Sequence, residues 1–150
     1  LRRCRAAKVN GDGFRITTSP GPQIRPSIRT RNIRLLDCRC VGRTTIAWGV
    51  EDVLIQGGRF DGPVCLGFAA GTDPPEGNGT KGPVRSVTLR QTRVGQLLIN
   101  SQVGNPTGKL GDAVYPDYVP NIRLLQVLQD RPAKIIGEGA NIEVRPGSSR

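Results

Sequence analysis

The sequence contains no histidine and no methionine, and its 150 residues include only one tryptophan, two tyrosines and three phenylalanines. Without histidine the chain cannot form a His-based catalytic triad. So few aromatic side chains supply no stacking platforms for single-stranded nucleic acid, so we do not expect nucleic acid as a partner. No run of roughly 18 apolar residues and no signal-peptide pattern is present, which argues against membrane insertion.

Acidic residues are also scarce. The chain has twelve Asp and Glu residues and 22 Lys and Arg residues, which gives a formal net charge of +10. This balance favours polyanionic partners such as nucleic acid, acidic polysaccharide or a negatively charged cell surface. Arginine makes up 18 of the 22 basic residues. A GC-rich genome produces the same bias, so the bias alone does not indicate a function.

What the chain does contain is a repeat. Its fullest copy spans 32–48, and partial copies follow at 52–68, 86–99, 121–136 and 141–144, with the end of an earlier one at 4–16. Self-similarity at a period of 20 to 50 residues is typical of stacked structural units that share one core.

Within the fullest copy, apolar residues alternate in three short runs. The inward positions are Ile33 and Leu35, then Cys38 and Cys40, then Ile46 and Trp48. Alternation with period two indicates strands with one buried face. Three short strands cannot close on themselves, but stacking each on its counterpart in the next copy buries every inward residue. The sequence therefore predicts a β-solenoid.

The pattern Asn-Ile-x-Leu-x-Asp-Cys-x-Cys at 32–40 resembles the repeat of right-handed parallel β-helices, the family of pectate lyases, polygalacturonases and phage tailspikes. The resemblance implies an all-β, right-handed parallel β-helix, here of about five coils. The family often stacks asparagines at the second corner of the coil. The equivalent positions here are Asp37, Gly57, Gln91 and Gln126, so an amide ladder is incomplete. The pair Gly57-Gly58 is typical of a tight corner.

The length favours a single domain that spans residues 1–150. The chain does not begin with methionine and its first copy starts in mid-strand, so we expect a fragment of a longer chain. Equivalent positions at 4, 38, 58, 92 and 127 are 34, 20, 34 and 35 residues apart. The longer intervals carry Gly- and Pro-rich excursions at roughly 17–31, 69–83 and 100–120. Because all leave the same corner, we expect them on one edge, either as a binding surface or as surface padding.

Three cysteines, Cys4, Cys38 and Cys40, fall at inward positions, whereas Cys65 falls in the outward set. They do not form a Cys-x-x-Cys pair, so we expect no zinc and no other metal or cofactor. Two interpretations remain: buried free thiols that act as small apolar side chains, or a disulfide.

Hydrolases of the resembled family need paired carboxylates on an outward face. The outward positions of the third run are Arg15, Ala47, Cys65, Gly67 and Leu98, and none of them is acidic. We therefore assign no catalytic residue. Because this outward face is nearly uncharged, at Ala47, Gly67 and Leu98, we expect it to pack against another subunit or against the loops. A pectate-lyase-like elimination, with arginine as base and carboxylate-bound calcium, stays open, although the carboxylates show no Asp-x-Asp clustering.

The positive signal is a column of arginines. Arg5, Arg39, Arg59 and Arg93 occupy the outward position between the two inward residues of the second run in successive copies. Stacked strands would place them about 4.8 Å apart, an unfavourable arrangement unless an anion binds. Tyr115 and Tyr118, in the third excursion, are candidates to stack on sugar rings. An arginine-rich composition alone is the competing explanation.

These observations favour a virion tail or spike segment, structural and receptor-binding, that recognises an anionic surface polysaccharide. The resemblance implies a homo-oligomer, commonly a trimer, at the virion or otherwise extracellular. The alternative is a uronate polysaccharide lyase or epimerase.

Overall fold

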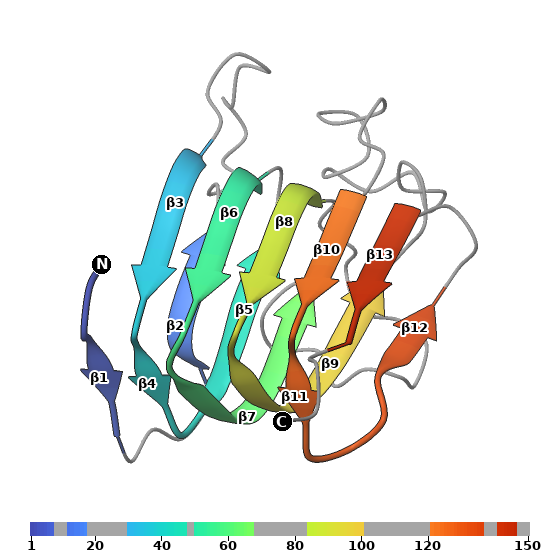
Figure 1. The fold of residues 1–150 in the computed structure, drawn as a ribbon. Coiled ribbons are helices and arrows are strands. Elements are labelled where there is room, and N and C mark those ends of the chain that lie inside the picture. The colour runs from blue at the N-terminus through green and yellow to red at the C-terminus, as the bar shows by residue number, and fades with distance from the viewer. Residues whose placement is uncertain are drawn as a thin grey trace.

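The computed structural model describes residues 1–7, 12–17, 30–47, 50–67, 84–100, 121–136 and 141–146. Within these segments every regular element is a β-strand, and the strands form two sheets in which each pairing is parallel (Figure 1). The all-β prediction is confirmed. The described segments contain no helix, and therefore none that is long and apolar enough to span a bilayer.

The first sheet consists of the strands that open each copy of the repeat. In the order in which they pair, they are β3 (Arg31–Leu36), β6 (Val50–Gln56), β8 (Val84–Arg90), β10 (Asn121–Leu125) and β13 (Asn141–Arg145). Equivalent residues of the repeat are partners in the register, so that Leu35 lies beside Ile55, and Ile55 beside Leu89. The repeat predicted from the sequence is therefore the pairing register of this sheet.

The second sheet contains the later runs of each copy. Its strands are β1 (Arg5–Ala6), β2 (Asp12–Thr17), β4 (Arg39–Cys40), β5 (Arg43–Ala47), β7 (Arg59–Leu66), β9 (Arg93–Asn100), β11 (Leu128–Gln129) and β12 (Lys134–Ile136). The long strands β7 and β9 combine two runs, so β7 pairs with both β4 and β5, and β9 with both β11 and β12. In Figure 1, β7 and β9 lie behind the first sheet and run in the opposite direction to it. This succession of stacked parallel strands is compatible with a β-solenoid.

Between the two sheets the chain turns through one residue with a positive φ in each coil. These residues, which we call the αL corner, are Arg3, Asp37, Gly57, Gln91 and Gln126, with φ of 51°, 53°, 66°, 49° and 56°. Their backbone amides are satisfied by the next coil: Asp37 N–H donates to Gln56 O at 2.8 Å and Gly57 N–H to Arg90 O at 3.0 Å. Gly58 also has a positive φ, of 77°, and a Cβ there would overlap the carbonyl oxygen of Cys38. The corner assigned to Gly57 and Gly58 from the sequence is thus confirmed.

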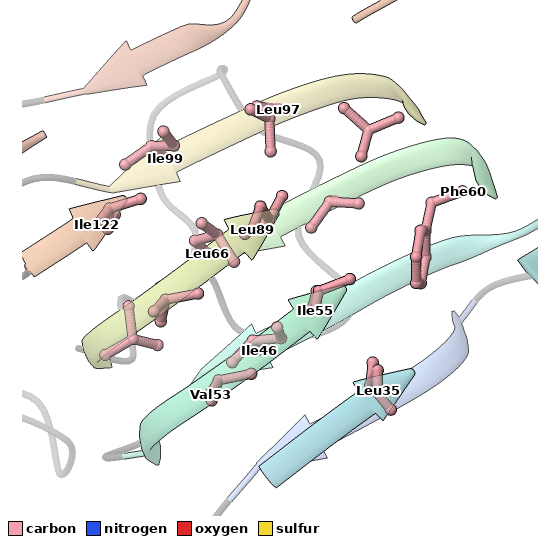
Figure 2. Close-up of a cluster of buried hydrophobic side chains, with 14 of the residues drawn as sticks. Leu35, Ile46, Val53, Ile55, Phe60, Leu66, Leu89, Leu97, Ile99 and Ile122 are labelled. Atoms are coloured by element: carbon pink, nitrogen blue, oxygen red, sulfur yellow. The ribbon is translucent and has the colours of Figure 1, made fainter. Parts of the chain in front are cut away.

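The core lies between the sheets (Figure 2). Leu35, Ile55 and Leu89 of the first sheet and Ile46, Leu66, Leu97 and Ile99 of the second are fully buried there. Phe60 is also buried, and its ring lies 6.3 Å from that of Phe14. The inward positions predicted at Leu35, Cys38, Cys40 and Ile46 are confirmed, while Ile33 is only partly buried.

All four cysteines are free, which is the first of the two interpretations above. Cys65 and Leu98 form a small cluster apart from the main core, as their outward positions predict, but they are only 2% and 6% exposed. Ala47 on the same face is fully buried. This face is therefore buried within a single chain and does not require a second subunit. Trp48 and nearly all of the three excursions lie outside the described residues.

Candidate anion-binding edge

The four arginines singled out in the sequence lie in one register column. Arg5 is the strand partner of Arg39, Arg39 of Arg59, and Arg59 of Arg93. All four side chains are exposed. We call this column the arginine row. Its geometry follows the spacing in the sequence, and its role in binding stays a prediction.

The αL corner positions the row. Each of these arginines follows the corner residue of its coil by two positions, as Arg39 follows Asp37 and Arg93 follows Gln91. The residues on either side point inward: Cys38 and Cys40, which flank Arg39, are both buried. Alternation along the strand then directs each guanidinium to the solvent.

Two carboxylates accompany the row. Asp61 accepts a hydrogen bond from Arg59 Nε and lies 3.9 Å from Arg39 Nη2, while Asp130 lies 2.7 Å from Arg93 Nη2. Arg5 has no ion-pair partner among the residues that the structure describes. Two negative charges therefore serve four guanidiniums, and the row keeps half of its formal positive charge.

The hydrogen bond from Arg59 to Asp61, with the negative charge of that carboxylate close by, raises the pKa of Arg59 above its usual range. Arginine is already protonated at every pH at which proteins fold, so this shift adds no titration in that range. Arg59 stays a cation whether or not a ligand is bound.

Arginines on the outward face of the first sheet are arranged differently. Arg31 lies 3.3 Å from Glu51, Arg34 lies 3.2 Å from Asp52, and Arg123 lies 3.1 Å from Glu143. Each of these ion pairs joins neighbouring strands. On this face an arginine therefore lies beside a carboxylate of the next strand, whereas in the arginine row it lies beside another arginine.

A recess of about 340 Å³ opens at the αL corner of the later coils. It is lined by Arg90, Gln91, Leu125, Gln126, Arg145 and Pro146. Sequence reasoning identified Gln91 and Gln126 as corner residues but missed Arg90 and Arg145 as candidate site residues. The sequence does show that Arg90 comes just before the corner residue of its coil and that Arg145 holds the equivalent position in the last coil, which could have identified both.

Tyr115 and Tyr118 lie outside the described residues. Within the described segments no three His, Cys, Asp or Glu side chains lie close enough together to hold a metal ion. The arrangement that the structure does show is a positively charged edge able to form two-point hydrogen bonds with oxyanions.

Comparisons of the chain with protein-family models, with curated proteins and with solved structures give no match. The function is therefore inferred from the geometry of the site.

Proposed function

We propose that this chain is a segment of a right-handed parallel β-helix that binds an anionic glycan along the arginine row, as a structural and receptor-binding part of a virion tail or spike. The path in Figure 1 supports the handedness: the chain descends along the first sheet, ascends along the second, and advances from β3 towards β13 with each coil. Parallel crossovers of this hand are strongly preferred in proteins.

The observation that carries the binding proposal is the register of the arginine row. Arginine lies directly opposite arginine in three consecutive strand pairs. Like charges in this position are destabilising, since two unit charges about 5 Å apart repel by ~0.8 kcal/mol even in water. A bound polyanion removes that repulsion and gains charge-assisted hydrogen bonds.

The spacing of the row suits a linear ligand. Strands about 4.8 Å apart place the outer two of the four arginines roughly 14 Å from each other. A polysaccharide that lies parallel to the coil axis would meet the guanidiniums in turn. The planar fork of each guanidinium pairs with a carboxylate or sulfate group through two hydrogen bonds.

The test compares two double variants that remove the same charge. Arg39→Gln with Arg59→Gln removes two positive charges from the row, while Arg34→Gln with Arg123→Gln removes two from the first sheet. Retention on an immobilised polyuronate or sulfated glycan is measured against salt concentration. We expect the row variant to elute at lower salt with a flatter salt dependence, and the sheet variant to stay close to the unmodified chain.

Equal loss in both variants would mean that net charge alone drives retention, and no loss in either would remove the row as a binding site. The same incubations are followed by ultraviolet absorbance for an unsaturated product. Its appearance would replace the binding function with the lyase alternative. The oligomer is tested by sedimentation, where a stable monomer would contradict a trimeric spike.

A further inference from the structure

The recess at the αL corner is built from three successive coils. Arg90 and Gln91 lie at the end of β8, Leu125 and Gln126 at the end of β10, and Arg145 and Pro146 at the end of β13. Arg93 of the arginine row follows Gln91 by two residues. The recess is therefore on the same edge of the molecule as the last arginine of the row.

The recess is cationic. Arg90 is exposed and has no ion-pair partner in the described part of the chain. Arg145 lies 2.6 Å from Glu143, but Glu143 is also 3.1 Å from Arg123, so one carboxylate is shared by two guanidiniums. A positive charge remains available to an anion in the recess.

The backbone at the corner does not require glutamine side chains at positions 91 and 126. The N–H of Gln91 donates to Leu125 O at 2.9 Å and that of Gln126 to Arg145 O at 2.8 Å, so the corner is already satisfied without their side chains. Both residues hold a positive φ, which glycine adopts more easily and which Gly57 supplies in the preceding coil. Their carboxamides are exposed and have no hydrogen-bond partner among the described residues.

We infer that the recess is a subsite for one acidic sugar unit of the glycan, an inference that rests on the proposed function for the identity of the ligand. Arg90 and Arg145 bind the carboxylate or sulfate group, and the carboxamides of Gln91 and Gln126 bind neighbouring hydroxyl groups. Leu125 and Pro146 provide an apolar surface for the C–H groups of the ring. A volume of about 340 Å³ lies at the lower end of small-molecule pockets, about 300–1,000 Å³, which favours a short end of a glycan over a long stretch.

The experiment uses short probes that are too small to span the row. A uronate disaccharide, a sulfated disaccharide and a neutral disaccharide are each titrated into the isotopically labelled chain. Side-chain amide resonances of Gln91 and Gln126 are followed by NMR. We expect both acidic probes to shift these resonances and the neutral one to leave them in place. A response to only one acidic probe would assign the anion as carboxylate or sulfate, whereas equal shifts with the neutral sugar would overturn the proposal.

Two variants locate the binding. Arg90→Gln with Arg145→Gln should weaken disaccharide binding at least about tenfold, since a single charge-assisted hydrogen bond already contributes about that much. Gln91→Gly with Gln126→Gly keeps the positive φ and removes the side chains with their carboxamides, so it should weaken binding while the circular dichroism of the fold is unchanged. Asp37→Gly, at the same corner but outside the recess, is the matched control and should bind normally.

The two proposals fail separately. If the Arg39→Gln, Arg59→Gln variant loses the polymer but no disaccharide shifts Gln91 or Gln126, the row binds glycan and the recess does not. If disaccharide binding depends on Arg90 and Arg145 but the Arg39→Gln, Arg59→Gln variant retains the polymer as well as the unmodified chain does, the subsite stands and the row proposal is wrong.

Discussion

On the outward face of the first sheet three arginines each lie next to a carboxylate of the neighbouring strand, whereas in the arginine row each arginine lies next to another arginine. Arg31, Arg34 and Arg123 pair with Glu51, Asp52 and Glu143. In the row, Arg39 and Arg59 share Asp61 and Arg93 pairs with Asp130, while Arg5 has no such partner among the described residues. The same residue type thus lies beside a carboxylate on one surface and beside its own kind on the other. An arginine-rich composition explains the number of arginines, but not their different surroundings.

The largest expected effect comes from breaking the corner that positions the row. Gly58→Ala introduces a Cβ that overlaps the carbonyl oxygen of Cys38 at a φ of 77°. We expect a loss of about 3 kcal/mol or more, from overpacking and backbone strain together. Chemical denaturation measures it. Gly57→Ala is the control, since Gly57 also has a positive φ, of 66°, but a Cβ there meets the side chain of Asp37 and not the backbone of Cys38. A similarly large loss there would show that the conformation, and not the contact with Cys38, is responsible.

A smaller effect should follow removal of the carboxylate that the row shares. Asp61→Asn leaves Arg39 and Arg59 side by side without a counter-charge, so we expect it to cost about 1 kcal/mol at low salt. Asp52→Asn releases only Arg34 and should cost about half as much. Thermal unfolding at low and high salt separates the two. Asp61→Asn should also strengthen glycan retention, and weaker retention would contradict the binding role of the row.

In the smallest effect, two arginine substitutions should change the free energy of unfolding in opposite directions. Arg39→Gln relieves repulsion between neighbours and should leave stability unchanged or raise it by a few tenths of a kcal/mol, whereas Arg34→Gln removes an ion pair and should lower stability by a similar amount. Both side chains are exposed, so packing contributes little. Denaturation midpoints of the two single variants give the comparison directly. A loss of stability in Arg39→Gln would mean that the attraction between Arg39 and Asp61 outweighs the repulsion between neighbouring arginines.

The residue sequence by itself determined the strands, their stacking and the arginine row. Alternation at Leu35, Cys38 and Cys40 fixes which side chains are buried, because successive residues of a strand point to opposite faces. The repeat then fixes the register, because a slip by one residue would expose the whole buried set. Arg5, Arg39, Arg59 and Arg93 come into one column as a direct consequence.

Only the tertiary structure decided what surrounds that column. Asp130, which is 37 residues from Arg93 in the sequence, is brought beside it. Cys65 and Leu98 are buried although they point away from the main core. The recess joins residues as far apart as Arg90 and Arg145. The coils differ in length, so distances along the chain do not say which side chains of separate coils approach each other. That depends on the bends at the αL corner and on the direction each long side chain takes, which the alternation of apolar residues does not encode.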